Sequence, residues 1–453
     1  MKLSKKILVG ALLSSSLLVA AGCGKSGSSD KGDDEKVAVE VWLTPQWKGV
    51  YSADEDGADY DSFFKAAAEK YEKENPNVDI SVQVIPGEQR SDKLSVAIQT
   101  KQLPDIFFDS SFALSEYAHM GVLEPLTDII DDQTKSDISD AIWDNVTIGD
   151  DVYFYPFGHN PGTLVYNADM FKAAGLDQYI GDEHAIANWT PEDLQVITKK
   201  LKEANPDIAP MGLFAKNNQG DTWNMSYLRM FGNEFFGEDG KIVLNDASGV
   251  KALNYIDQLR KDGLTTAGAE TLTSNDVNAM FQNQQVAISF TNSVLLNGVL
   301  ADMENGKVQK FDARLANIPG ETNPISFTYV TSSIVFNTGD DARTKAAKDF
   351  VKFFSSDEEL VMASKNTLPV RESVISQLTA EMPYLAAYNE NSEYLINFSN
   401  NTPGYAEIRN ALFPELQALF TGDKTVEQAL ESFETNGNRI IEENQKKSVI
   451  VNK

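Results

Sequence analysis

The pattern of apolar and polar positions alternates between strand-like and helix-like segments at the start of the chain. Residues 37–43 and 78–85 alternate with period two and are rich in β-branched side chains, which is typical of strands. Residues 61–75 and 91–101 have the apolar spacing of helices, and Pro76 ends the first of them. This order predicts an α/β fold with largely parallel sheets.

A short buried strand and a further helix continue the same order. Residues 104–109 are an apolar run that ends in Asp109, and residues 112–120 have a helical pattern that stops at a glycine. Farther along, Thr190 followed by a proline predicts another helix start. No period of about 20 to 50 residues recurs, which excludes a repeat architecture.

The stretch 152–176 departs from this pattern and carries the first candidate chemistry. Residues 152–155 and 163–166 are strand-like, and two prolines and two glycines between them predict a loop. A ring, an imidazole and an amide on such a loop suit a polar ligand with flat apolar faces, although an ordinary aromatic-rich turn is the alternative. These side chains are Phe157, His159 and Asn160.

The N-terminal residues have the pattern of a targeting segment. Residues 1–22 combine three lysines with an apolar run that is too short to cross a bilayer comfortably, which predicts a signal peptide. Cys23 is the only cysteine, and its position after small residues resembles the bacterial lipobox, in which this cysteine is lipidated. Plain secretion is the alternative. Residues 24–36 lack large apolar side chains and predict a flexible linker.

Length and charge narrow the possible architectures and partners. Residues 37–453 exceed the usual size of one hydrophobic core, so two lobes are expected. Removal of the signal peptide takes away three lysines and brings the formal charge from −28 to −31. A field of this sign excludes binding of nucleic acid or of an anionic lipid surface through overall charge.

Several short motifs occur along the chain in the order of one known family. They occupy residues 103–126, 166–176, 189–194, 281–288, 346–357, 367–371 and 425–430. Together they resemble the family-1 extracellular solute-binding proteins, the maltose-binding-like receptors of bacterial ABC importers. The chain departs from that pattern at Gln284, where glycine is usual, and in a long insert at residues 177–188.

The resemblance implies a two-lobed periplasmic-binding-protein-like fold of type II, with a ligand cleft between the lobes. Three segments should cross between the lobes, near residues 156–163, 317–322 and 366–371. Each of these places carries proline or glycine, as expected of a hinge. Lobe one would comprise residues 37–157 and 319–366, and lobe two residues 158–318 and 367–453.

Candidate ligand residues follow strands or lie on the crossings, where ligands of open α/β sheets bind. A sugar requires aromatic faces for its C–H surfaces, and amides or carboxylates for its hydroxyl groups. The candidates of these types are Gln46, Trp47, Asp109, Ser110, Phe157, His159, Asn160, Trp223, Asn224, Phe290, Asn292, Tyr329 and Arg371.

Several candidates have a structural alternative. Trp47 and Trp223 are both expected in polar loops, but Trp47 could simply pack on the surface. Asp109 and Ser110 could instead cap the following helix. Arg371 could form an ion pair between the lobes.

The resemblance implies an extracytoplasmic lipoprotein that captures a carbohydrate, expected to be an oligosaccharide, and delivers it to the permease of an ABC importer. We expect a monomer without cofactor, metal or catalytic residues, tethered to the membrane through Cys23. A secreted glycan-acting enzyme, a surface receptor, or the same fold with a non-sugar solute remain the alternatives.

Motifs for other chemistry are missing from the sequence. The three histidines form no H-E-x-x-H pair, and there is no C-x-x-C or G-x-S-x-G. A polysaccharide-degrading enzyme would need a pair of carboxylates. With 67 acidic residues some carboxylates must lie near one another, so the sequence leaves this alternative open. The acidic run 54–61 could hold calcium, but it lacks the spacing of a calcium loop, so a solvated loop is favoured.

Replacement of the cysteine tests the lipid anchor. We expect Cys23→Ala to be released from the membrane fraction of the producing cells, because the anchor would lose its attachment atom. Fractionation followed by immunoblotting measures this. A Cys23→Ala protein that stays in the membrane fraction after its signal peptide is removed would contradict the assignment.

Overall fold

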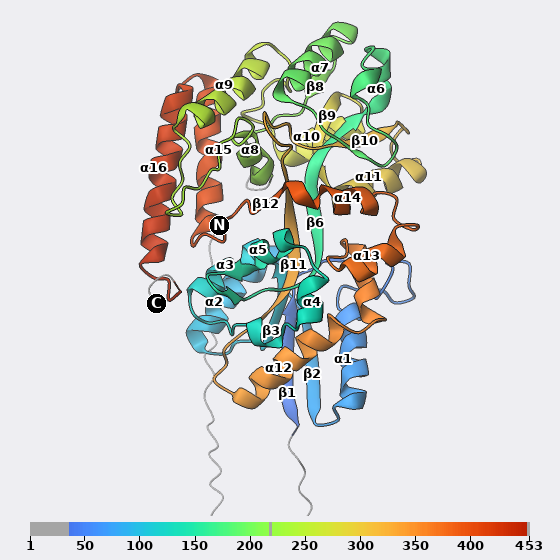
Figure 1. Ribbon diagram of the computed structural model, residues 1–453, viewed down its shortest axis with the longest axis vertical. Coiled ribbons are helices and arrows are strands. Elements are labelled where there is room, and N and C mark those ends of the chain that lie inside the picture. The colour runs from blue at the N-terminus through green and yellow to red at the C-terminus, as the bar shows by residue number, and fades with distance from the viewer. Residues whose placement is uncertain (1–35, 217–219, 451–453) are drawn as a thin grey trace, which may run out of the picture. The chain divides into compact units, whose positions relative to one another are not determined.

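The first strands of the chain form the parallel part of a mixed sheet in the computed structural model, which describes residues 36–216 and 220–450 (Figure 1). Strand β1 (Val37–Leu43) pairs in parallel with β2 (Val78–Val84) on one side and with β3 (Ile106–Ser110) on the other. All three strands were predicted from the sequence, and the structure confirms them.

Helices cover both faces of these strands, because alternate side chains bury opposite faces. Val39 and Val41 of β1 pack with α1 (Ser62–Glu74) in one core cluster. Trp42 faces the other way, into a cluster that includes residues of α2 (Arg90–Thr100) and α3 (Ser111–His119). The three predicted helices are therefore confirmed.

The proline- and glycine-rich stretch lies within one long strand, not in a loop. Strand β6 (Tyr155–Asn167) runs for 13 residues through the middle of the sheet (Figure 1). It pairs antiparallel with β11 (Ser326–Val335) from residue 155 to 162. Beyond that point it pairs with β9 (Val286–Asn292) and β10 (Ala313–Ala316). The predicted loop between two strands is wrong.

Close contacts with neighbouring segments explain the glycines of β6. A Cβ atom at Gly158 would lie 1.9 Å from Thr367 Oγ1, and one at Gly162 would lie 2.2 Å from the ring of Phe327. Both distances are far shorter than any real Cβ contact. Glycine is therefore required because other segments press against the strand, and not because the chain turns there.

Three segments run side by side at this point of the sheet. Gly158 bridges Pro369, and the amide of His159 donates to the carbonyl of Leu368 at 2.9 Å. On the other side of β6, residues 328–331 of β11 lie opposite residues 158–161. These contacts join the part of the sheet that contains β1–β3 to the part that contains β9 and β10.

The second crossing segment, predicted near residues 317–322, lies farther along the chain than predicted. The amide of Asn317 donates to Ala187 at 2.9 Å, and that of Glu321 donates to Met230 at 2.8 Å. Residues 317–322 therefore stay with the β9–β10 part of the sheet, and β11 itself makes the passage. The sequence suggested the earlier position because glycine and proline cluster there. The residue limits of the two lobes remain a prediction.

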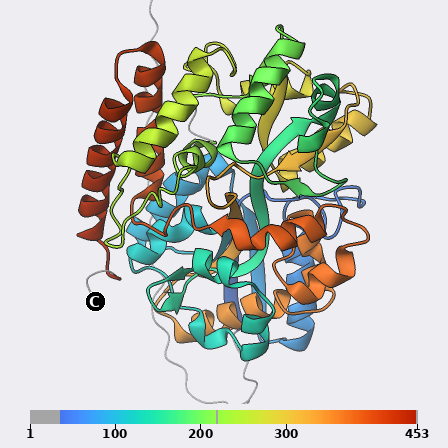
Figure 2. The same ribbon diagram turned by 45° about the horizontal axis from the view of Figure 1, so that its top comes forward.

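The remaining elements surround this sheet. Helix α7 (Pro191–Ala204) starts after Thr190, as predicted, and Thr190 and Asp193 form a capping box there. Helices α15 (Tyr405–Thr421) and α16 (Val426–Gln445) pack together beside α9 (Ala247–Lys261) (Figures 1 and 2). The further strands are β4 (Thr147–Ile148), β5 (Asp151–Val152), β7 (Ile186–Ala187), β8 (Ala209–Met211) and β12 (Leu395–Ile396). The further helices are α4 (Asp132–Ser136), α5 (Asp140–Val146), α6 (Ala168–Ala173), α7 (Pro191–Ala204), α8 (Asp221–Tyr227), α9 (Ala247–Lys261), α10 (Ser274–Gln282), α11 (Ser293–Glu304), α12 (Asp341–Phe354), α13 (Glu372–Leu378), α14 (Leu385–Glu390), α15 (Tyr405–Thr421) and α16 (Val426–Gln445).

Three predictions concern residues at the N-terminus. The signal peptide, Cys23 and the linker up to residue 35 lie outside the described residues. Among the described residues, no helix has the length and apolar character needed to span a membrane.

A matched pair of glycine substitutions tests the packing around β6. We expect Gly162→Ala to lower the free energy of unfolding by about 1–3 kcal/mol, because the new methyl group overlaps the buried ring of Phe327. Gly298→Ala in α11 is the control, since nothing beyond its own helix backbone and chain neighbours lies within 4 Å of its added Cβ, and the change should be neutral or stabilising. Urea unfolding measures both. Equal effects of the two substitutions would contradict this packing.

Candidate functional site

Polar candidates gather where β1 and β3 end. Asp109 is buried, and its Oδ2 pairs with Nη1 of Arg90 at 2.7 Å. Its Oδ1 accepts the amide of Ser110 at 2.7 Å and lies 3.4 Å from Nε2 of Gln46. Ser110 is the N-cap residue of α3, but its side chain makes no capping hydrogen bond. Arg90 was not predicted, because it belongs to a helix with no local binding motif.

Two aromatic candidates beside this group stack on each other. The rings of Trp47 and Phe157 lie 5.8 Å apart and are nearly parallel, at 9°. Phe63 and Phe108 surround the pair, with ring centroids 5.6 and 6.0 Å from Trp47. Phe157 is buried, and Trp47 is half-buried. The structure therefore gives Trp47 a packing role, the alternative foreseen from its sequence, and leaves only part of its indole accessible.

A third group lies where β6 and β11 run side by side. Asn160 is directly opposite Tyr329 in the strand register. The Oδ1 atom of Asn160 accepts from the hydroxyl of Ser293 at 3.0 Å, and the hydroxyl of Tyr329 donates to Thr222 Oγ1 at 2.9 Å. Both residues are half-buried. They are therefore partly accessible candidates on the strands that connect the two parts of the sheet, whereas Phe157 and His159 of β6 are buried. Asn292, next to Ser293, caps α11 through the amide of Leu295.

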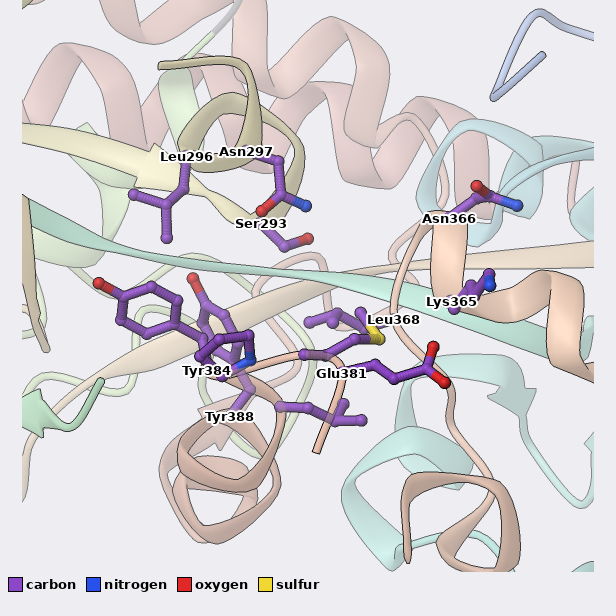
Figure 3. A pocket seen from close by; sticks show the side chains of 12 residues that line it. Ser293, Leu296, Asn297, Lys365, Asn366, Leu368, Glu381, Tyr384 and Tyr388 are labelled. Atoms are coloured by element: carbon purple, nitrogen blue, oxygen red, sulfur yellow. The ribbon is translucent and has the colours of Figure 1, made fainter. Parts of the chain in front are cut away.

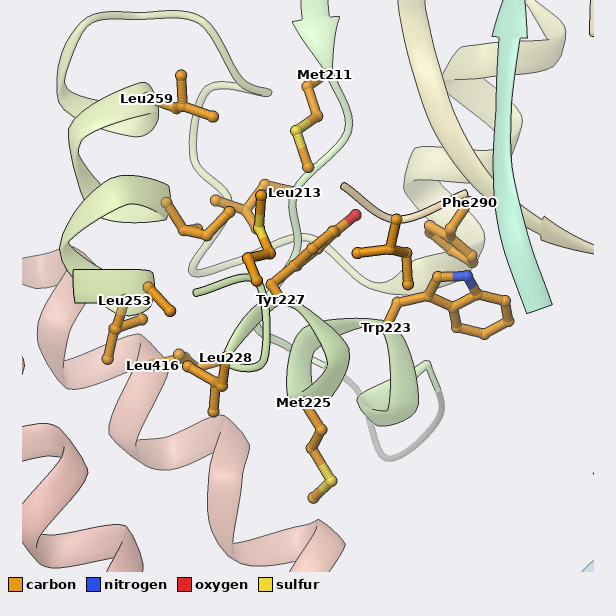
Figure 4. Packing of buried hydrophobic residues seen from close by; sticks show 14 of the residues in the cluster. Met211, Leu213, Trp223, Met225, Tyr227, Leu228, Leu253, Leu259, Phe290 and Leu416 are labelled. Atoms are coloured by element: carbon orange, nitrogen blue, oxygen red, sulfur yellow. The ribbon is translucent and has the colours of Figure 1, made fainter. Parts of the chain in front are cut away.

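Trp223 lies in a buried helix and not in the polar loop expected from the sequence. It belongs to α8 and packs against Phe290, with ring centroids 4.8 Å apart (Figure 4). Its Nε1 donates to the carbonyl of Thr163 at 3.0 Å. Asn224 donates to the carbonyl of Phe214 at 3.3 Å. The polar residues next to Trp223 in the sequence suggested an exposed loop. The prediction was wrong because their side chains are bonded inside the protein. Trp223→Ala would therefore also remove core packing, at a cost of about 3–5 kcal/mol.

A buried ion pair that the sequence did not reveal holds α8 in place. Asp221, at the first position of α8, is 1% exposed and pairs with Arg409 of α15. The guanidinium of Arg409 lies 5.4 Å from the ring of Phe112, and this ring is 5.3 Å from that of Tyr329. Phe112 belongs to α3, which packs on the β1–β3 part of the sheet. The partners are 188 residues apart, so no local spacing could have indicated the pair.

His159 has a structural role between two strands. It is buried, its Nδ1 lies 3.1 Å from Thr328 Oγ1, and burial lowers its pKa from 6.5 to about 4. The imidazole is therefore neutral near pH 7, and its contacts hold β6 against β11.

Arg371 lies apart from the other candidates. Its Nη1 is 3.4 Å from Asp137 Oδ2, and its backbone bridges Ile138. The structure therefore shows an ion pair at Arg371, and its position between the lobes remains a prediction.

The acidic run near the N-terminus has an internal role. Glu55 accepts the backbone amides of Val50, Tyr51 and Ser52, at 2.6, 2.6 and 2.8 Å. These bonds lower the pKa of the Glu55 carboxyl and order the loop. Within residues 36–216 and 220–450, no group of three or more His, Cys, Asp or Glu side chains is arranged to hold a metal ion.

Comparison with known proteins identifies the family. Residues 54–360 match the family model described as bacterial extracellular solute-binding protein, and the chain belongs to this family. A relative from Brucella abortus, named only as a binding protein, is 22% identical over 80% of this chain and 85% of its own length. The sn-glycerol-3-phosphate-binding periplasmic protein of Pectobacterium atrosepticum is 24% identical over 63% of this chain and 65% of its own.

A solved structure shows the same fold. The cyclic α-maltosyl-1,6-maltose binding protein of Arthrobacter globiformis superimposes with a TM-score of 0.73 at 24% identity, covering 90% of this chain and 100% of that protein. The predicted two-lobed α/β fold is therefore confirmed. The protein is a bacterial extracellular solute-binding protein.

Proposed function

We propose that the protein captures a carbohydrate, most simply an oligosaccharide, between the two parts of its sheet and releases it unchanged to the permease of an ABC importer. The observation that carries this proposal is the position of Asn160 and Tyr329 on the two strands that connect those parts. Ligand contacts there can respond to the relative movement of both parts.

The polar groups around these strands suit hydroxyl groups. Asn160 offers an amide on the β9 side, beside the buried hydroxyl of Ser293, and Gln46 offers an amide on the β3 side, beside the buried carboxylate of Asp109. Such groups donate to and accept from sugar hydroxyls at the same time. The name of the Arthrobacter globiformis protein, which refers to a maltose-containing cyclic sugar, supports the same ligand class.

A neutral sugar fits the charge of the chain better than an anion. The formal charge is −28 over the whole sequence, and a strongly anionic solute would meet an unfavourable field. The Pectobacterium atrosepticum relative is nevertheless named for a phosphate-containing solute. A ligand screen must therefore include sn-glycerol 3-phosphate beside the neutral sugars.

Attachment to the membrane is part of the proposal. Lipidation at Cys23, after a signal peptide at residues 1–22, would hold a monomer near the permease outside the cytoplasmic membrane. No chemical change of the sugar is required for this role. A glycan-acting enzyme or a non-transporting receptor would differ from it by releasing altered glycan or by acting without a permease.

A ligand screen with a matched pair of asparagine variants tests the proposal. We expect a neutral oligosaccharide from a panel of malto-, xylo- and manno-oligosaccharides to raise the melting temperature of the mature protein. Asn160→Ala should then weaken the binding of that sugar roughly tenfold, because one hydrogen bond contributes about 0.5–1.5 kcal/mol and its partner groups lose their acceptor. Titration calorimetry measures the affinity.

Asn254→Ala is the control, since this exposed side chain only bonds the carbonyl of Val250 within α9. Its sugar affinity should equal that of the unaltered protein. Stabilisation by sn-glycerol 3-phosphate alone, with no response to any glycan, would refute the carbohydrate proposal. Release of shortened glycan from the panel would favour the enzyme alternative.

A further inference from the structure

A pocket of about 360 Å³ lies beside the point where β6 meets the third connecting segment (Figure 3). Its walls come from the first turns of α11, from residues 365–368, and from residues 381–388 around the start of α14. We call it the side pocket. None of the candidate ligand residues predicted from the sequence lines it.

Direct contacts tie the side pocket to the candidate site. Ser293, one of its lining residues, donates to Asn160 Oδ1 at 3.0 Å. Leu368, another lining residue, accepts the amide of His159 at 2.9 Å. Two lining residues of the pocket are therefore bonded to consecutive residues of β6, and the pocket borders Asn160 through Ser293.

The side pocket has an aromatic end and a charged end. Figure 3 shows Tyr384 and Tyr388 at one end and Lys365 and Glu381 at the other. The hydroxyl of Tyr384 donates to the carbonyl of Ala313 at 3.3 Å, so this half-buried ring is held in place. An oriented ring of this kind can pack against the C–H face of a sugar.

The charged end favours a ligand that is neutral overall. Neither Lys365 nor Glu381 has an ion-pair partner within 4 Å among the described residues. One ammonium and one carboxylate on the same rim cancel in net charge. They can donate to and accept from neighbouring hydroxyl groups. Asn297, an exposed side chain of α11, adds an amide to the wall.

We propose that the side pocket binds one end of the oligosaccharide, so that the protein selects longer glycans over shorter ones. This inference rests on the proposed function, because it assigns further contacts to the same ligand. The volume is at the lower limit of ligand pockets, about 300–1,000 Å³, and it suits a terminal part of a glycan better than a whole chain. The remainder of the glycan then extends past Ser293 to Asn160.

The walls of the side pocket come from both parts of the sheet. Lys365 follows a segment whose residues Leu360 and Ala363 pack in the β1 core cluster. Ser293 begins α11, which follows β9. A glycan end in the pocket therefore contacts both parts at once, and its binding energy contributes to their closure. Shorter sugars that stop at Asn160 lack these contacts.

A glycan ladder with two variants tests this length selection. The probe is the series whose members raise the melting temperature in the ligand screen; for maltooligosaccharides this is maltose to maltohexaose. In the unaltered protein we expect the affinity to rise at the length that first fills the side pocket. Tyr384→Ala should weaken binding of glycans beyond that length about tenfold and leave shorter ones unchanged, because the ring touches only the terminal part.

Further variants separate loss of a contact from loss of structure. Asn297→Ala, whose side chain is exposed, should reduce the affinity for long glycans by a smaller factor without a change in melting temperature. Tyr394→Ala, a half-buried tyrosine outside the side pocket, is the control and should bind the whole ladder normally. Titration calorimetry supplies the affinities.

The outcomes distinguish this inference from the proposed function. Glycan binding that is independent of length, or equal loss for short and long glycans in Tyr384→Ala with normal Asn297→Ala, overturns the side pocket while the carbohydrate proposal stands. Absence of binding to every glycan refutes the proposed function, and the side pocket assignment is then refuted with it.

Discussion

The contact of two other segments with the middle of β6 is the constraint on which the rest of the structure depends. Gly158 presses against Thr367, and Gly162 against the ring of Phe327, without room for a single added carbon atom. Since β6 pairs with β11 at one end and with β9 and β10 at the other, one strand belongs to both parts of the sheet. Its prolines remove two ladder donors, and the register with β11 shifts between Thr331 and Ser332. Bending is easier where the ladder is interrupted in this way.

The position of β6 determines the geometry of the candidate site. Asn160 is held opposite Tyr329 by the register, and Asp109 is oriented by Arg90 before any ligand arrives. The polar groups that would meet a sugar are therefore already bonded to the protein. Such preorganisation lowers the conformational entropy lost on binding. The buried pair of Asp221 and Arg409 acts in the same way on α8, although neither residue belongs to a recognisable motif.

Patterns among residues close in the sequence made much of the fold predictable. The alternation of β1 and β2 and the capped start of α7 at Thr190 depend on neighbouring residues only, and each was found at its predicted place. Contacts between distant residues explain the errors. Pro156 and Gly158 predict a loop when only their neighbours are considered, yet they belong to a strand because the distant strand β11 pairs with them. Trp223 appeared to be a loop residue because its polar neighbours find their partners in α15 and in the core. The side pocket was invisible for the same reason, since Ser293 and Tyr384 are brought together only by the fold.

In the proposed function, ligand contacts on β6 and β11 couple sugar binding to a movement of the two parts of the sheet. Small-angle X-ray scattering of the mature protein, with and without a saturating amount of the glycan found in the screen, tests it most directly. We expect a smaller radius of gyration when the glycan is bound, because contacts from both parts are made only in the closed form. An unchanged radius at proven saturation would contradict it.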